Sequence, residues 1–440
     1  MLRRILALAL LALVVSGGAA SAQTFSARRM AMGGAILAGG GSGGSVANVA
    51  YRGVPAAPRS AWSLPLPIGL IPLLADPPEL DPDKPDFNVY ELANLLYNPP
   101  WNLQLRSPAV PGNDITILIG KDHLSADLGD VKNVFPHDPS RIATVLNGPE
   151  LGFTVKRFFL AAAPLVHYEN ELSFNDALLG AIDGEEFRPN TSYETTDRGY
   201  GQVAAGVHLG WAGPLVQTGD PRGKGMGLYA GARVKLLRGL AYGSTDNSVA
   251  FTTGDEILAN DPVDVHYVGH HFDAGPEGGG FGRGLDVGAV SMAGGLEAGL
   301  GVNDIGTTID WRVREIIATT DPVTGDYVQQ VVARDIPLTS KVPTTATANA
   351  AARLGPFLLA GDVVRGVHVT TGHLGAETWL DKTVALRAGA YLDANELIQY
   401  TAGTGLRFGA IGVDLALASN SRNLSRERGL ELGAGLAFYH

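Results

Sequence analysis

The clearest pattern in this chain is an alternation of apolar and other side chains between residue 366 and residue 440. Runs of roughly ten residues carry an apolar side chain at every second position and are separated by short turns. In one run Leu386 and Ala388 share the apolar face, while Arg387 lies on the opposite face. Such two-faced runs are typical of transmembrane β-strands, whose outer face meets lipid and whose inner face meets water.

The same alternation recurs upstream as far as Asn113. Residues 113–440 are therefore predicted to form an antiparallel β-barrel of about 14 strands. The barrel must be closed, because an open sheet in lipid would leave backbone hydrogen-bonding groups unpaired. No segment after residue 22 approaches the ~18 consecutive apolar residues of a membrane helix. The predicted fold class is all-β, a transmembrane barrel.

Charged residues recur on the strand face opposite the apolar one, which predicts that they point into the lumen. Two interpretations stay open. These charges steer an amphipathic or charged solute, or they form ion pairs that hold the wall to material inside it. The predicted lumen charges are Arg233, Lys235, Asp286, Glu297, Arg312, Arg314, Glu377, Arg387, Arg407 and Asp414.

Residues 23–112 lack this sustained alternation. The stretch Ser26–Ser45 is rich in glycine, and Phe87–Asn98 is the best helix candidate, ended by Pro99 and Pro100. We expect a plug with one short helix inside the barrel; an ordinary N-terminal soluble subdomain is the alternative. Apolar residues of the plug are expected to line a ligand pocket against the wall: Leu64, Leu66, Ile68, Leu70, Ile71 and Leu73.

The first 22 residues have the organisation of a secretory signal peptide. Arg3 and Arg4 precede the apolar run Ile5–Val15, and Ala20-Ser21-Ala22 is a small-residue cleavage site. Export together with a barrel predicts a location in the bacterial outer membrane. Outer-membrane lipid is then the first expected partner.

Composition excludes several classes of function. Without the two signal arginines, 31 of the 33 basic residues remain against 44 acidic ones, which argues against a nucleic-acid partner. The absence of cysteine excludes disulfides, a thiol nucleophile and cysteine-ligated metals. The 58 glycines have no three-residue period, which excludes collagen and suits bent or crowded barrel strands.

Short motifs in the chain favour neither a cofactor nor a metal. Gly40–Gly44 matches a nucleophile-elbow pattern, but a glycine-rich stretch of sequence matches it by chance. His266, His270 and His271 are interpreted as loop residues, and the acidic run Asp76–Asp86 as a solvated loop. An enzyme such as a lipid hydrolase would need a Ser-His-acid set at the lipid face, and no such pairing is evident. We therefore predict no enzymatic activity.

Two stretches resemble FadL-like outer-membrane proteins, a group that includes fatty-acid and hydrocarbon channels and barrels linked to secretion or conjugation. The opening Ser26–Ala35 matches the group's start at Ala27, Arg28 and Met32–Ala35. Gly375–Gly389 resembles the group's late strand pair. Ala31 replaces the first glycine of the opening, and the chain ends in His440 rather than Phe or Trp.

The resemblance implies a plugged barrel inserted by the barrel assembly machinery. It also implies passive uptake of small hydrophobic molecules, which is the leading hypothesis for function. The alternative is a non-transporting barrel that serves secretion or conjugation as an accessory or scaffold.

Overall fold

The computed structural model describes residues 26–35, 44–55, 61–79, 84, 88, 102–107, 116–119, 124–128, 140–147, 150–255, 264–274, 279–321, 327–392, 398–419 and 428–439. The predicted signal peptide and the predicted helix Phe87–Asn98 lie outside these residues, apart from Asn88. Among the described helices, none combines the length and apolar character needed to cross a membrane.

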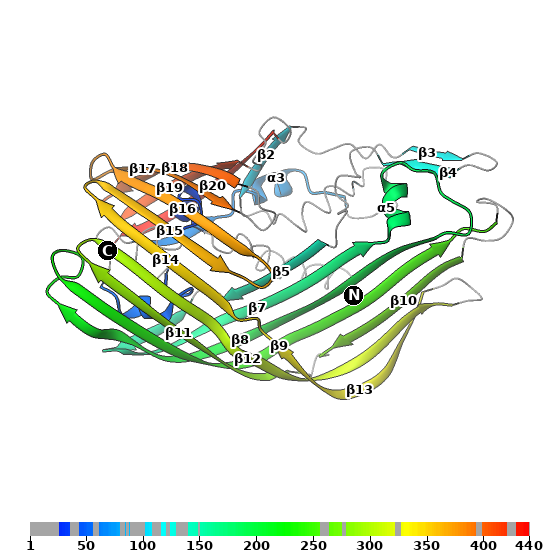
Figure 1. The fold of residues 1–440 in the computed structure, drawn as a ribbon, viewed down its shortest axis with the longest axis horizontal. Helices are drawn as coiled ribbons and strands as arrows, with labels where there is room; N and C mark the ends of the chain where they lie inside the picture. The colour runs from blue at the N-terminus through cyan, green and yellow to red at the C-terminus, as the bar shows by residue number, and fades with distance from the viewer. Residues whose placement is uncertain are drawn as a thin grey trace.

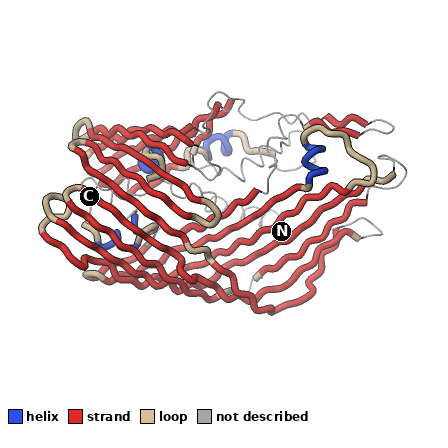
Figure 2. Tube along the Cα trace, viewed as in Figure 1, coloured by secondary structure: helices blue, strands red, loops and turns tan. Residues whose placement is uncertain are grey.

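One antiparallel sheet forms the wall of the molecule, as Figures 1 and 2 show. Its long strands have 17 to 27 residues, more than the ~9–11 that cross a bilayer. They are β7 (Phe158–Phe174), β8 (Ser192–Thr218), β9 (Met226–Thr252) and β12 (Leu296–Thr320).

The strands from β14 onward are short, with 9 to 12 residues each. In Figure 1 the long strands therefore extend far to the right of the short ones. We call the part of the sheet between residues 140 and 341, which contains the long strands, the tall wall, and the part from β14 onward the short wall. The short wall consists of β14 (Thr345–Leu354), β15 (Phe357–Arg365), β16 (Thr370–Trp379), β17 (Val384–Leu392), β18 (Ile398–Phe408), β19 (Ile411–Ser419) and β20 (Arg428–Tyr439).

Four crossings of the wall are each made by two separate strands that pair with the same neighbour. They are β1 (Ala61–Leu66) with β2 (Leu103–Ser107), β5 (Ser140–Asn147) with β6 (Leu151–Val155), β10 (Asp264–Asp273) with β11 (Phe281–Ala293), and β13 (Tyr327–Lys341) with β14. Counting each such pair once turns the 18 strands described in this sheet into 14 crossings. This number agrees with the predicted one.

Side chains alternate between the two faces of the wall as predicted for a transmembrane barrel. On β9, Arg233 and Lys235 are buried, whereas Val234 and Leu236 between and beside them are about half exposed. Exposed apolar side chains recur on the outward faces of other wall strands, as at Leu300, Leu374 and Leu415. Such an apolar outer surface is much larger than soluble proteins expose and suits contact with lipid.

One predicted facing on β12 is wrong, because the inner row of this strand changes from small and polar side chains to apolar ones. Asp304 and Gly306 have positive φ angles of 60° and 59°, and the pairing with β11 shifts its register there. Beyond this bulge Trp311 is buried and Arg312 is exposed, with 62% of its side chain accessible. The inner row keeps its parity across the bulge, because Glu297 and Gly299 before it and Ile309, Trp311 and Val313 after it are all buried. Arg312 therefore does not point into the lumen.

The boundary predicted at residue 112 also differs from the structure, because β1 and β2 pair with β20 and belong to the wall. The remaining described N-terminal elements are α2 (Ala27–Ala31), the 3₁₀ helix η3 (Val49–Gly53) and the short helix α3 (Leu70–Ala75). Two further elements lie near the end of the tall wall that extends beyond the short wall, at the right of Figure 1. They are α5 (Asp176–Ile182) and a small sheet of β3 (Thr116–Ile119) and β4 (Leu124–Asp127).

Candidate functional site

The helix α2 lies against the inner face of the short wall, where glycines leave room for it. Gly375 on β16 and Gly389 on β17 face each other in register. A Cβ atom on Gly389 would lie 2.3 Å from the backbone nitrogen of Gly33, and one on Gly375 would lie 2.4 Å from the carbonyl oxygen of Met32. Backbone atoms cannot move aside cheaply, so only glycine permits this approach.

A buried ion network joins α2 to three strands of the short wall. The Arg28 guanidinium donates two hydrogen bonds to the Glu377 carboxylate, of 2.8 Å from Nε and 2.7 Å from Nη2. Arg387 donates to the same carboxylate at 2.8 Å and to Asp414 at 2.7 Å. We call these four residues the α2 network. It places two cations against two carboxylates in the interior.

The 3₁₀ helix η3 lies against β8, β9 and β11 of the tall wall in a comparable way. Asn48 caps it by accepting a hydrogen bond from the Ala50 backbone nitrogen at 3.0 Å, and its side-chain amide donates to the Ala289 carbonyl at 3.1 Å. A Cβ on Gly288 would lie 2.0 Å from the Asn48 side-chain oxygen. The inner face of the tall wall therefore also depends on glycine to receive the N-terminal segment.

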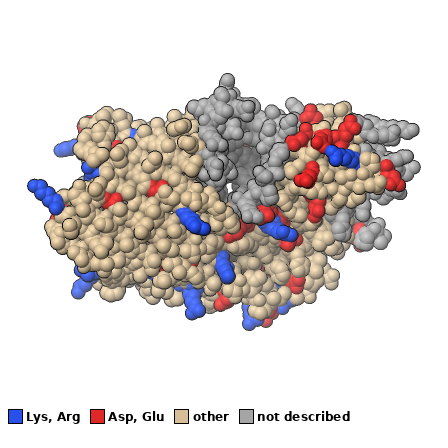
Figure 3. Space-filling view, in the orientation of Figure 1, with Lys and Arg blue, Asp and Glu red and all other residues tan. Residues whose placement is uncertain are grey.

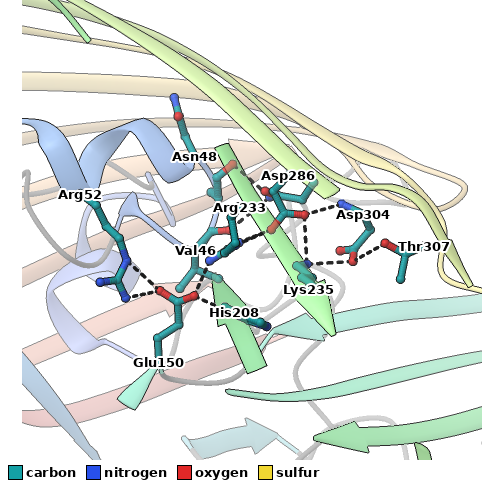
Figure 4. Close-up of polar contacts among 12 residues, drawn as sticks. Val46, Asn48, Arg52, Glu150, His208, Arg233, Lys235, Asp286, Asp304 and Thr307 are labelled. Carbon is teal, nitrogen blue, oxygen red and sulfur yellow. Dashed lines mark hydrogen bonds and ion pairs between the residues drawn. The ribbon is translucent and has the colours of Figure 1, made fainter. Parts of the chain in front are cut away.

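A second buried ion network extends from η3 into the tall wall (Figure 4). Arg52 donates to Glu150, and the same carboxylate contacts Arg233 and His208, the latter at 2.8 Å. Asp286 and Asp304 continue the network. We call the η3 network the set Arg52, Glu150, His208, Arg233, Lys235, Asp286 and Asp304.

The far half of the η3 network is entirely buried. Arg233 donates to Asp286 at 2.6 Å. Lys235 lies 3.1 Å from Asp286 and donates to Asp304 at 2.8 Å, and neither its side chain nor the two carboxylates are exposed. Three cations thus meet three carboxylates, and His208 stands beside Glu150. This arrangement supports the salt-bridging interpretation of these predicted lumen charges.

The ten predicted lumen charges fall into two groups. Seven are buried inside the wall: Arg233, Lys235, Asp286, Glu297, Glu377, Arg387 and Asp414. Glu297 pairs with Arg222 at 3.3 Å. The other three have different positions: Arg312 is exposed, Arg314 pairs with Asp273 with about a third of each side chain exposed, and Arg407 lies over the Tyr439 ring near the β18–β19 turn.

Beyond the η3 network, the inner rows of the tall wall become apolar. On β9 the order is Arg233, Lys235, Leu237, and on β8 it is His208, Gly206, Ala204. These apolar side chains pack together with others from β7, β12 and the start of the segment after β13. We call this cluster the apolar layer: Leu165, Ala204, Leu237, Ile309, Trp311, Val313 and Val342.

A polar bridge crosses the interior next to the apolar layer and joins strands that do not pair. Trp311 donates from its indole nitrogen to the Ser340 hydroxyl at 2.8 Å, and Ser340 donates to the Gln202 side-chain oxygen at 2.5 Å. Gln202 lies on β8 and Ser340 on β13. The opposite sides of the tall wall therefore meet at this level.

Above the apolar layer the tall wall encloses an open hollow of about 630 Å³, which we call the outer hollow. The inner rows of β7, β8 and β9 supply most of its lining, and His368 reaches it from the turn between β15 and β16. His368 lies 3.2 Å from the Glu169 carboxylate, so this contact joins the short wall to the tall wall. Described residues that line it are Glu169, Glu171, Arg198, Tyr200, Tyr242, Asp246, Lys341 and His368.

The predicted apolar pocket of the plug does not form among the described residues. Leu64 and Leu66 lie on the wall strand β1, in register with Leu436 and Ala434 on the outward face of β20. Leu70, Ile71 and Leu73 belong to α3, a helix with no buried residue, and Ile68 in the preceding turn is only partly buried. Leu64 and Leu66 therefore belong with the outward surface rather than with a ligand site.

The described residues contain no group of three or more His, Cys, Asp or Glu side chains arranged to hold a metal. His270 and His271 are neighbours on β10, so their side chains leave opposite faces of the strand. His270 pairs with Glu315 at 2.8 Å, whereas His271 contacts Asn247 at 2.7 Å. They are strand residues rather than the loop residues predicted.

Sequence reasoning missed several members of the two networks. Arg28 was noted only as part of the opening motif, and Arg52, Glu150, His208 and Asp304 were not singled out. The motif itself held a usable signal, because Arg28 and Glu377 lie in the two stretches that resemble the same protein group. Glu150 precedes β6 outside any alternating run, and nothing in its surroundings predicts an inward carboxylate.

No protein-family model matches the sequence, and no curated protein sequence matches it. Among solved structures, the chain is similar to the TodX deltaS2S3 mutant, a monoaromatic hydrocarbon channel, with 10% identity over 72% of this chain and 84% of that chain and a TM-score of 0.34. The Pseudomonas putida toluene transporter TodX shares 12% identity over 66% and 88%, with a TM-score of 0.28. A triple mutant of the Rhodopseudomonas blastica porin shares 10% over 64% and 100%, with a TM-score of 0.21.

Proposed function

We propose that this chain is an outer-membrane β-barrel channel that passes small hydrophobic molecules. The observation that carries the proposal is the apolar layer across the interior of the tall wall. A hydrated solute would have to lose water to pass Leu237, Ile309 and Trp311, and an unpaired polar group in such surroundings costs several kcal/mol, roughly 2–7. An apolar solute loses nothing comparable there.

The location follows from the same physical reasoning. The outward face carries exposed apolar side chains on both walls, and most of the buried charged side chains are engaged in the α2 and η3 networks. A surface of this kind is stable in lipid and unfavourable in water. We therefore expect the mature chain to fractionate with outer membranes and to open its outer hollow toward the cell exterior.

The test compares two neighbouring residues of β9 that face opposite ways. Leu237→Ala removes a side chain that is 2% exposed in the apolar layer, whereas Leu236→Ala removes one that is 50% exposed on the outer face. Entry of the apolar dye N-phenyl-1-naphthylamine into intact cells would be followed by fluorescence, alongside swelling of arabinose-loaded proteoliposomes. We expect Leu237→Ala to speed dye entry several-fold, while arabinose passage changes little and Leu236→Ala matches the parent.

A second candidate function is a barrel that transports nothing and acts as a scaffold. The packing of the apolar layer favours it, because all seven side chains are at most 3% exposed. In that case dye entry in cells that make the parent protein equals entry in cells without it, and Leu237→Ala changes only stability. That result would contradict the channel proposal.

A further inference from the structure

We infer that an outward patch of the tall wall, at the end of its apolar band, binds the phosphate groups of membrane lipids. The patch consists of Arg238, Arg283, Thr308 and Lys341, and we call it the cationic rim. The inference rests on the membrane location in the proposed function and adds a lipid-binding site to it. The partner is a phosphorylated lipid of the leaflet nearest the outer hollow.

The outward row of β9 shows where the apolar band ends. Its six side chains from Met226 to Leu236 are all apolar, and the next one is Arg238. At ~3.3 Å per residue this row is ~33 Å long, and a strand tilted by ~40° therefore rises ~25 Å along it. A transmembrane barrel has an apolar band of about 25 Å. Arg238 is thus the first outward residue of β9 beyond the lipid tails.

The neighbouring strands change from apolar to polar at their outward rows in the same way. On β11 the row from Ala293 to Leu285 is small or apolar, and Arg283 follows it. On β12 the row is apolar as far as Val302 and polar from Thr308 onward. Figure 3 shows this change on one face of the molecule: the left part, where the short wall lies, is mostly tan, and several Lys and Arg side chains stand out in the middle.

The strand register places two cations on either side of one hydroxyl group. Thr308 on β12 lies opposite Arg283 on β11 and opposite Lys341 on β13. Lys341 is exposed and follows the buried Ser340, so its side chain belongs to the outward row. Neighbouring strands lie ~4.8 Å apart, which separates the Cα atoms of Arg283 and Lys341 by about 10 Å. Two long basic side chains can therefore meet over Thr308 and hold one phosphate between them.

These two cations are available to a ligand. Within the part of the chain that the structure describes, the side chains of Arg283 and Lys341 form no ion pair, whereas the buried Lys235 contacts two carboxylates. Arg238 lies beside them, with its guanidinium carbon 4.9 Å from the centre of the Phe281 ring. The aromatic contact holds this third cation at the same rim without neutralising it.

The acidic residues of this surface have partners of their own. Asp310 lies two residues beyond Thr308 on β12 and accepts a hydrogen bond from the Thr339 hydroxyl at 2.6 Å. Arg312 and Asp335 lie further out and face each other at 3.8 Å. The pair Arg283 and Lys341 therefore lies between the apolar band and this polar surface, at the depth where lipid phosphates are found.

The cations are gathered on one side of the barrel. On β15 the outward row ends in Arg365, next to the tall wall. The outward rows of four further strands of the short wall end in uncharged side chains, which are Thr370 on β16, Leu392 on β17, Ile398 on β18 and Leu430 on β20. A local group of this kind fits a site for individual lipid molecules better than a uniform belt around the barrel.

The experiment titrates the mature protein in an uncharged detergent with lipid A, a glycolipid that carries two phosphate groups. Native mass spectrometry counts the lipid molecules bound, and the same glycolipid without its phosphates is the comparison. A basic residue beside an anionic lipid strengthens binding about fivefold, so Arg283 and Lys341 together should contribute about 25-fold. We expect the parent to prefer lipid A by this factor and R283Q/K341Q to lose the preference.

The control variant K224Q/K382Q removes the same charge from the β8–β9 and β16–β17 turns, at the opposite end of the barrel. It should bind lipid A as the parent does. Arg283 and Lys341 are both exposed, so R283Q/K341Q should unfold at the same urea concentration as the parent. If the double variant does not fold, Lys341→Gln alone should weaken lipid A binding about fivefold.

Equal binding of the two glycolipids by the parent overturns the inference. Lipid A binding that is unchanged in R283Q/K341Q, or that falls equally in K224Q/K382Q, overturns it as well. Cell fractionation and entry of the apolar dye test the proposed function separately. A parent protein that fractionates with outer membranes and admits the dye keeps the proposed function without this site, and a chain found in the soluble periplasm loses both.

Discussion

Each of the two networks that hold the N-terminal segment contains one arginine of that segment, Arg28 in the α2 network and Arg52 in the η3 network. The two networks differ in how they would respond to the loss of that arginine. In the α2 network, the ion pairs among the described residues give Glu377 and Asp414 only Arg28 and Arg387 as cationic partners. In the η3 network, Glu150 contacts Arg52, Arg233 and His208 together. Glu377 therefore receives one of its two ionic partners from the N-terminal segment. Glu150 keeps two partners that belong to the wall.

The contact of α2 with the short wall is therefore needed for folding, whereas the contact of η3 with the tall wall can be released. Without Arg28, two buried carboxylates would face the single guanidinium of Arg387. Without Arg52, Glu150 would retain its contacts with Arg233 and His208. The short wall therefore needs α2 to complete its interior, whereas the tall wall can keep its interior when η3 leaves.

The largest expected effect is that of Arg28→Ala. Leaving a buried carboxylate without its partner costs about 3–5 kcal/mol, and we expect a loss of this size in the free energy of unfolding. Urea unfolding in lipid vesicles, followed by tryptophan fluorescence, measures it. The double variant Arg28→Met with Glu377→Gln leaves Arg387 paired with Asp414 and should recover part of the loss. A double variant as unstable as Arg28→Ala would show that packing, not charge, fixes α2.

Gly375→Ala should have the next largest effect, because it pushes α2 away without changing any charge. Its new Cβ would lie 2.4 Å from the Met32 carbonyl oxygen, and such overpacking costs about 1–3 kcal/mol. We expect higher ion conductance in planar bilayers as α2 is displaced. Gly372→Ala on the same strand is the control, since nothing lies within 4 Å of its Cβ. Equal conductance in both variants would mean that α2 does not restrict the lumen.

Arg52→Ala should be milder than Arg28→Ala. It removes hydrogen bonds to Glu150 and a contact with the Phe159 ring, whose centroid lies 4.3 Å from the guanidinium carbon. The expected loss is about 2 kcal/mol in the same unfolding measurement. His208→Ala in addition should cost more than the sum of the two single changes, because Glu150 then keeps one partner. An additive result would argue that His208 does not compensate.

The fold could be predicted from the sequence because the alternation is a local property of each strand. Leu386 and Arg387 alternate in the chain, and they alternate in the wall. The same alternation predicted that Arg233 and Lys235 on β9 face inward. The facing of Arg312 was not predicted, because the interior is apolar at its level, so the apolar side chains of Ile309 and Trp311 face inward and Arg312 faces outward.

The interior of the barrel was harder to predict because its contacts join residues that are far apart in the chain. Arg28 and Glu377 are separated by 349 positions. The strand β1 was taken for part of the plug although Leu64 and Leu66 alternate with Ser63 and Pro65, since a proline argues against a central strand. A deletion meant to remove only the plug has to spare Ala61–Leu66 and Leu103–Ser107.

The smallest expected effect concerns Asp381, in the turn between the strands that carry Glu377 and Arg387. Its substitution tests whether this turn stabilises the short wall. There the Asp381 carboxylate accepts hydrogen bonds from the Thr383 and Val384 backbone nitrogens, which lower the pKa of Asp381. A depressed pKa means that the ionised carboxylate stabilises the folded state above its unfolded pKa of ~3.9, and that this stabilisation is lost as the pH falls through the folded-state pKa.

Asp381→Ala should therefore be slightly less stable than the parent at pH 6 and equally stable at pH 2. Urea unfolding midpoints of both proteins at the two pH values measure this difference. A gap that persists at pH 2 would assign the role of Asp381 to turn geometry rather than to its charge.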